Sequence, residues 1–106
     1  MKVYLTQDTA QIKATFYQNA VLHSPATSTK VTIWAPDSDG DVCHVTKDID
    51  GVSMTESSTG VYTYNYDTTG KVVGIYAVSV VGIESTTAPV NIARQDGEFE
   101  IKAYPG

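Results

Sequence analysis

The chain has a single cysteine, a single arginine and only two leucines among its 106 residues. Because Cys43 has no second cysteine to pair with, an intrachain disulfide bond is excluded. The cysteine content therefore indicates neither a reducing nor an oxidising compartment. Arg94 is accompanied only by six scattered lysines, so the chain has no basic stripe that would neutralise phosphate groups. This absence argues against nucleic acid and against an anionic membrane surface as partners. The net charge of −5 is mild and favours solubility.

Long hydrophobic segments are also missing. No apolar run approaches the roughly 20 residues that a helix needs to cross a bilayer. Lys2 is not followed by an apolar core, so the N-terminal sequence does not predict a signal peptide. No stretch of helix length shows helical periodicity, and a chain of this size predicts one domain over residues 1–106.

The composition instead favours strands. Thirteen valines, fourteen threonines, seven isoleucines and seven tyrosines fit a pleated, half-buried surface. Tyr62, Tyr64 and Tyr66 recur with period two, which predicts a strand with one buried face. After turn residues at 67–71, a second strand of similar strength carries Tyr76. Two successive strands of this kind predict an all-β domain, but they predict no chemistry.

Shorter strands with turn signals between them fill the rest of the sequence. They are predicted at residues 3–5, 10–18, 30–35, 42–46, 52–55 and 98–103. Seven or eight strands with turns about every ten residues predict a sandwich or a barrel. We expect the strand pairs to be antiparallel, because parallel pairs need long crossover connections.

The connections follow from turn-forming residues. Residues 30–47 predict a hairpin with its turn at residues 37–41, and residues 96–97 predict a further turn. Another turn is predicted at residues 48–51, and residues 19–29 predict a polar loop. Residues 85–95 contain proline and apolar residues in no clear period, so they predict either a strand or an irregular segment.

Several motifs resemble those of bacterial and phage immunoglobulin-like domains. They are Ser-Thr-Gly-Val-Tyr-Thr-Tyr-Asn-Tyr from Ser58, Gly-Ile-Tyr-Ala-Val from Gly74, Trp-Ala-Pro-Asp from Trp34, and Gly-Glu-Phe-Glu-Ile from Gly97. The resemblance covers residues 8–101 and implies an antiparallel immunoglobulin-like β-sandwich of seven to eight strands. The chain has no Cys–Trp–Cys core, so it is not similar to an antibody-type domain.

The same resemblance implies roles for individual residues. Tyr76 is similar to the tyrosine corner of these domains, whose hydroxyl bonds back to the main chain, and Gly74 precedes it in the motif. Tyr62 and Tyr64 would be structural. The implied function is a non-catalytic structural or protein-interaction module of a phage particle or a cell-surface assembly, with other protein chains or a second copy as partners. Its location would be the virion, or the cytoplasm before assembly.

A second resemblance gives an alternative function. Thr-Ile-Trp-Ala-Pro from Thr32 resembles the opening of the starch-binding-type modules attached to glycogen-branching enzymes. It implies a carbohydrate-binding β-sandwich module and a glycan as partner. This chain lacks the further tryptophans with which that family stacks on sugars.

Trp34 is the best candidate for a contact residue, together with Tyr17 and Thr32. By alternation Trp34 faces away from Val31 and Ile33, toward solvent or a partner, and exposed aromatic side chains mark interfaces and sugar platforms. In the alternatives, a loop or a neighbouring subunit covers Trp34, or a bulge turns it inward. The tyrosine row at residues 62–66 is expected in the core, with an exposed binding ladder as its alternative.

Residues that commonly bind metals occur in two places. Asp37, Asp39 and Asp41 lie in a row, but Gly40 does not stand where a calcium loop of the EF-hand type needs its glycine, so we expect a plain hairpin turn.

His23 is expected in a loop and His44 on a strand beside Cys43, which is expected to be a small buried hydrophobe. The spacing of the two histidines is not that of a zinc site. No nucleophile elbow, phosphate loop or metalloprotease helix occurs, so we expect no catalytic residues, no metal and no cofactor.

Overall fold

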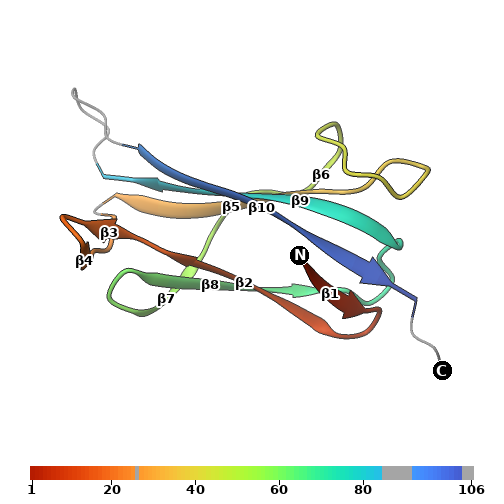
Figure 1. Cartoon of the computed structure of the whole chain (residues 1–106), viewed down its shortest axis with the longest axis horizontal. Coiled ribbons are helices and arrows are strands. Elements are labelled where there is room, and N and C mark those ends of the chain that lie inside the picture. Colours follow the sequence, from red (N-terminus) through yellow and green to blue (C-terminus); the bar gives the residue numbers. More distant parts are fainter. Residues whose placement is uncertain (26, 85–91, 104–106) are drawn as a thin grey trace.

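The computed structural model describes residues 1–25, 27–84 and 92–103, and the described chain is all-β, with its strands in two stacked layers (Figure 1). One sheet has five strands in the order β1-β10-β9-β5-β6, and the other has three in the order β2-β8-β7. A two-stranded pair, β3-β4, lies at one end (Figure 1). The all-β prediction is confirmed. No helix among the described residues has the length and hydrophobicity to cross a membrane.

Most strands are short, and the two long ones, β9 and β10, are neighbours in the larger sheet. Their bounds are Lys2–Leu5 (β1), Thr9–Thr15 (β2), Tyr17–Gln18 (β3), Val21–Leu22 (β4), Ser28–Trp34 (β5), Lys47–Ser53 (β6), Thr55–Ser58 (β7), Val61–Asp67 (β8), Gly74–Ile83 (β9) and Ile92–Lys102 (β10). These ten segments exceed the predicted seven to eight. The strands predicted at 10–18 and 52–55 are each divided, and β4 was not predicted, while the strand predicted at 42–46 is absent.

The core lies between the two layers and is filled by the period-two rows that the sequence predicts. Tyr62 and Tyr66 are buried and Tyr64 is half-buried, so the tyrosine row faces inward, as predicted. Ala10 and Ala14 on β2 give room for these rings. From the larger sheet come Val31, Ile33, Tyr76, Val78, Val80, Phe99 and Ile101.

The prediction of purely antiparallel pairing is wrong at one place. β1 pairs with β10 in parallel, with Lys2 opposite Phe99 and Leu5 opposite Lys102. The other strand pairs are antiparallel. The rule that parallel neighbours need a long crossover still holds, since nearly the whole chain connects these two strands.

The strand predicted at residues 10–18 is interrupted at Phe16. The Phe16 amide donates to the carbonyl of Gly60 at 2.8 Å, and the Phe16 carbonyl accepts from the His23 amide at 3.0 Å. The chain thus leaves the β2–β8 ladder and forms the β3–β4 hairpin instead of the predicted polar loop. Asn19 and Ala20 form its turn, with φ of 52° and 64°. Positive φ at both central residues is the mark of a type I′ hairpin turn.

The hairpin predicted at residues 30–47 also differs. Its second strand is not at residues 42–46; β5 pairs with β6, so the predicted turn at residues 48–51 lies inside a strand. The reason is that Gly40 is held against β9, where its carbonyl accepts from the Ile75 amide at 2.9 Å. This contact draws the loop away from β5. Cys43 is consequently half-buried in a loop, and His44 is in the same loop rather than on a strand.

The remaining differences concern the edges of the sheets. The chain passes from β6 to β7 through the buried Met54, so the predicted strand at 52–55 belongs to two sheets. Asp96 and Gly97 form no turn; they lie within β10, opposite Ser79 and Val78 of β9. Pairing along β9 overrides their local turn preference. The prediction for residues 85–95 falls partly outside the described residues, and residues 92–95 are strand.

Candidate functional site

The outer face of the five-stranded sheet carries the most distinctive surface of the domain. β5 turns Val31 and Ile33 into the core, so Trp34 lies on the opposite, outer face, as predicted. Trp34 pairs with Ala77 on β9, and Ala77 in turn pairs with Glu98 on β10. These three strands together form the floor and the sides of a hollow.

The hollow has a volume of about 840 Å³ and opens to solvent. Its floor is made by small side chains of the central strand, Ala77 and Ser79, while larger side chains stand on both flanks. Trp34 and His44 form one side, and Arg94, Asp96 and Glu98 of β10 line the other. A small residue between two large ones leaves a depression in a pleated surface, because directly opposed side chains lie on the same face.

Trp34 is held in place rather than projecting freely. Its side chain is half-buried, and its ring meets the ring of His44 edge-on, with 4.9 Å between the centroids. The alternative in which a loop covers Trp34 is therefore partly realised, since His44 belongs to the loop after β5. One side of the indole packs within the chain, and the residue still lines the hollow.

Ser79 is the unusual residue of the floor. It is only 6% exposed, and its hydroxyl has no hydrogen-bond partner within the described part of the chain. A buried polar group without a partner costs on the order of 1–3 kcal/mol. Replacing Ser79 with alanine would remove this cost, and a bound partner that formed a hydrogen bond with the hydroxyl would offset it.

The structure does not bring the three predicted contact residues together. Thr32 shares the outer face with Trp34, but its hydroxyl accepts a hydrogen bond from the Gly51 amide at 3.1 Å. Tyr17 is 65% exposed on β3, next to Phe16, which lies against Gly82. Gly82 is five positions along β9 from Ala77, or roughly 17 Å at the usual rise per strand residue. Tyr17 therefore belongs to a different region of the surface.

Tyr76 has the environment that its motif predicts. The residue is 1% exposed, and its hydroxyl donates to the carbonyl of Val72, four positions earlier, at 2.6 Å. Burial is the main reason that the pKa of Tyr76 is raised to about 12, and the charge of Asp48 adds to it. Gly74 has φ of 142°, and a Cβ there would stand 2.8 Å from Pro36 Cγ. This position therefore requires glycine.

A second buried tyrosine is part of a polar cluster that the sequence did not suggest. The Tyr66 hydroxyl donates to Asp48 Oδ2, which also pairs with Lys71 Nζ at 3.0 Å. Burial, and then the hydrogen bond to the Asp48 carboxylate, raise the pKa of Tyr66 far above its usual range. Burial alone would raise the pKa of Asp48, but the Tyr66 hydroxyl and the Lys71 ammonium outweigh it and hold that pKa low. The cluster ties β6 to β8 and is structural.

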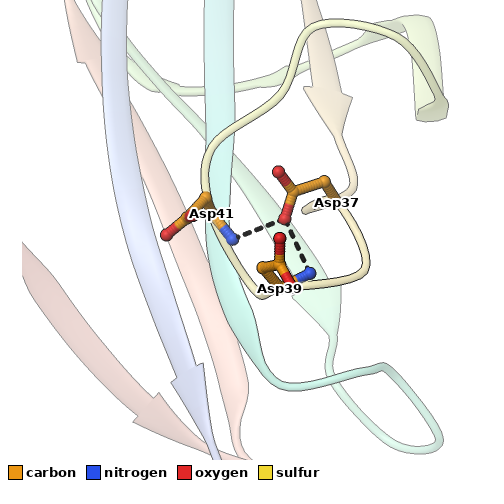
Figure 2. A group of neighbouring side chains, drawn as sticks. All are labelled: Asp37, Asp39 and Asp41. Carbon is orange, nitrogen blue, oxygen red and sulfur yellow. Dashed lines mark hydrogen bonds between the residues drawn. The ribbon is translucent and has the colours of Figure 1, made fainter.

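The three aspartates after β5 do come together. Their carboxylates lie within 4.8 Å of one another, and all three residues are exposed. Figure 2 shows that Asp37 Oδ1 accepts hydrogen bonds from the amides of Asp39 and Asp41, both at 2.9 Å. Asp37 thus closes a turn with its own side chain, as aspartates often do. This arrangement explains the acidic run as loop structure.

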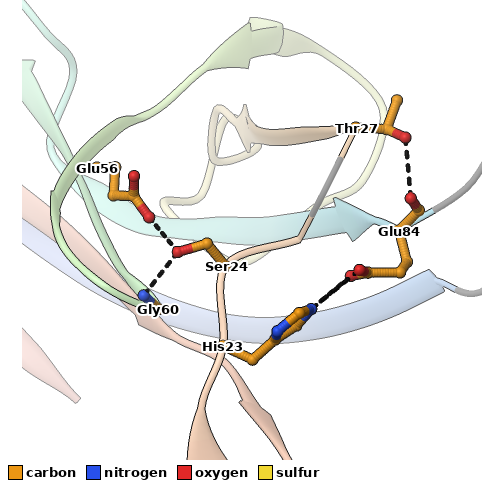
Figure 3. Close-up of polar contacts among 6 residues, drawn as sticks. All are labelled: His23, Ser24, Thr27, Glu56, Gly60 and Glu84. Atoms are coloured by element: carbon orange, nitrogen blue, oxygen red, sulfur yellow. Dashed lines mark hydrogen bonds and ion pairs between the residues drawn. The ribbon is translucent and has the colours of Figure 1, made fainter.

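The two histidines lie in different parts of the fold. His23 Nε2 donates to the Glu84 carboxylate at 2.9 Å, and His44 contacts Trp34 (Figure 3 shows His23). Nearby, the Ser24 hydroxyl accepts from the Gly60 amide at 2.9 Å and donates to the Glu56 carboxylate (Figure 3). These bonds fasten the segment after β4 to both sheets, so His23 has a structural role.

Sequence reasoning found Trp34 but missed the rest of the hollow. The available signal was alternation along β9: with Tyr76 facing inward, Ala77 and Ser79 must face outward. Two small residues in the middle of an outer face indicate a depression. The turn predicted at residues 96–97 concealed that Asp96 and Glu98 lie beside it.

The chain was also compared with known proteins. No family model, no curated protein and no solved structure matches it.

Proposed function

We propose that the chain is an immunoglobulin-like β-sandwich. The strand order supports this proposal. The order β10-β9-β5-β6 corresponds to the strands G, F, C and C′ of a variable-type domain, and β2-β8-β7 corresponds to B, E and D. The hydroxyl bond of Tyr76 also supports it, because Tyr76 stands near the start of the strand that corresponds to F.

On this fold we propose a non-catalytic interaction module, which contacts another protein chain of a virion or cell-surface assembly through the hollow beside Trp34. In antibody domains the tryptophan of strand C is part of the core. Here the core positions of β5 hold Val31 and Ile33, and the only tryptophan is on the outer face. The aromatic side chain is therefore available for contact.

The observation that carries the proposal is the unpartnered hydroxyl of Ser79 at the floor of the hollow. Burying this group without a hydrogen bond destabilises the isolated domain. Because the hydroxyl oxygen itself is buried, a partner side chain that enters between Trp34 and Asp96 can give it the missing bond only if the side chains around it move apart. An aromatic anchor surrounded by a polar rim is the usual composition of a protein interface.

Truncation of Trp34 tests this proposal. Trp34→Ala should weaken partner binding by more than tenfold, since buried interface tryptophans contribute about 2 kcal/mol or more. Because Trp34 is only half-buried, the loss of unfolding free energy should be about half of the 3–5 kcal/mol that a buried tryptophan costs. Tyr17→Ala is the matched control, because this exposed aromatic lies outside the hollow. Equal binding by both variants would contradict the proposal.

A carbohydrate is the second candidate partner. One feature favours it: Trp34 lies in the same hollow as the carboxylates of Asp96 and Glu98, which can accept hydrogen bonds from sugar hydroxyls while a ring stacks on the indole. A glycan array separates the two functions. Binding of a defined glycan that is lost in Trp34→Ala and kept in Tyr17→Ala would favour the carbohydrate module over the protein-interaction module.

A further inference from the structure

The edges of the two larger sheets differ in how well they are protected against pairing with another strand. β6 has two register shifts against β5, and β7 is four residues long and has a shift of its own. On the free side of β2, the Gln11 carbonyl accepts from the Tyr4 hydroxyl and the Thr15 carbonyl accepts from the Gln95 side chain. Irregular, short or capped edges resist pairing.

β10 has an edge without these protections. Its partner on that side, β1, begins at Lys2 and pairs only with Phe99–Lys102. Among the described residues, the segment from Ile92 to Glu98 therefore has a strand on one side alone. The segment contains no proline, and its pairing with β9 shows no register shift. Residues 93–98 are all exposed. A long, regular, exposed edge is a template for a further strand.

The sequence of this edge is complementary to itself. An antiparallel pairing of two copies that uses all seven residues from Ile92 to Glu98 must be centred on Gln95. In that register Arg94 of each copy lies opposite Asp96 of the other, so the dimer has two cross-strand pairs of opposite charge. Opposed residues share a face, so each pair lies on the outer face of the sheet.

Neighbouring registers that keep the core faces on one side are less favourable. A pairing centred on Arg94 sets two arginines against each other. One centred on Asp96 keeps two opposite-charge pairs, Arg94 with Glu98, but it sets two aspartates against each other, a repulsive contact that the Gln95 register lacks. Like charges directly opposite destabilise a strand pair. The register that uses the whole edge is therefore also the register that the charges select, although edge length and charge order are separate features of the chain.

We propose that the partner at this edge is a second copy of the chain, bound by antiparallel β10–β10 pairing centred on Gln95. The two five-stranded sheets then form one continuous sheet about a two-fold axis. Both Trp34 hollows lie on the same face of this sheet, because the axis keeps the outer faces together. The dimer does not require the hollow to be occupied.

Charge reversal tests the proposal. Arg94→Asp and Asp96→Arg each turn both cross-strand pairs into like-charge pairs, so each variant should dimerise about tenfold or more weakly than the parent chain. An equimolar mixture of the two variants restores every opposite-charge pair, and it should form a heterodimer as tight as the parent homodimer. Sedimentation equilibrium from micromolar to millimolar concentration measures the four dissociation constants, those of the parent, of each variant and of the mixture, and urea denaturation confirms that both variants are folded.

Three outcomes would overturn the proposal: a parent chain that stays monomeric at millimolar concentration, a dimer that both reversals leave intact, or a mixture that does not associate. Trp34→Ala is the control for contact between copies through the hollow. It should leave the dimer unchanged, so a dimer that is lost with Trp34 but indifferent to the reversals would place the contact between copies at the hollow. Conversely, a failure of this dimer leaves the binding test of the hollow unaffected.

Discussion

Removing the hydroxyl oxygen of Tyr76 tests how much its hydrogen bond to the main chain stabilises the fold. Tyr76 is 1% exposed, its ring is stacked on Phe99 with 5.2 Å between centroids, and its hydroxyl donates to the Val72 carbonyl at 2.6 Å. Tyr76→Phe keeps the stacked ring and removes only this bond. An intramolecular hydrogen bond contributes about 1 kcal/mol net, which corresponds to roughly 4 °C in melting temperature for a domain of this size.

The matched control is Tyr62→Phe. Tyr62 is also buried, at 8% exposure, and its ring packs edge-on against Phe16. Its hydroxyl makes no hydrogen bond to any residue that the structure describes. Urea denaturation should therefore show a clear loss of unfolding free energy for Tyr76→Phe and little change for Tyr62→Phe. The dependence of this free energy on urea concentration should be the same for both variants. If both variants lost the same free energy, the bond to Val72 would not be what fixes Tyr76.

Alkaline pH provides a second measurement on the same residue. The pKa of Tyr76 is raised to about 12, mainly by burial, so folding favours its neutral form. This stabilisation is complete below the unfolded pKa of about 10 and is lost as pH rises through the folded value. As the pH rises between these two pKa values, Tyr76→Phe should lose less unfolding free energy than the parent chain does. A parallel decline in both proteins would contradict the buried, neutral hydroxyl.

Two further predictions concern a glycine and a carboxylate. Gly60→Ala should destabilise the fold by on the order of 1–3 kcal/mol, because φ is +75° and a Cβ would stand 2.8 Å from backbone atoms. Gly70→Ala has the same φ with nothing within 4 Å, so a thermal melt should show a smaller loss there, and an equal loss would mean that contact is unimportant. The lowered pKa of Asp48 means that its stabilisation is complete above about pH 4 and is lost as pH falls through the folded pKa. Asp48→Asn should therefore lose less stability on acidification than the parent chain, and an unchanged acid response would exclude the Asp48 carboxylate, bonded to Tyr66 and Lys71, as its source.

The sequence predicted the fold best where alternation and burial agree. The inward tyrosine row, the buried Tyr76 and the outward Trp34 all follow from period two, because one face of each strand must be buried. Local turn signals were less reliable. The predicted turn at residues 96–97 is extended strand, since pairing with β9 outweighs the preference of an Asp-Gly pair.

The site was harder to predict because it is made by distant segments. Ser79 and Asp96 become neighbours only through the register of β9 against β10, which no local pattern encodes. β2 is interrupted because the Gly60 amide donates to the Ser24 hydroxyl, 36 positions away, and the Phe16 carbonyl accepts from the His23 amide. The contact between Asp48 and Tyr66 arises in the same way, from the packing of two sheets.

Site-specific photo-cross-linking tests whether the hollow beside Trp34 is a docking surface for another protein. A photoreactive amino acid is placed at Lys30, an exposed residue on the outer side of β5, or at Asn65, an exposed residue on the outer side of the other sheet. The chain is then irradiated in the cells or particles that naturally contain it. If the hollow is a docking surface, position 30 should cross-link to one defined protein. The cross-link should be absent from position 65 and lost when Trp34→Ala is added. Equal cross-linking from both positions, or a cross-link that persists without Trp34, would contradict it.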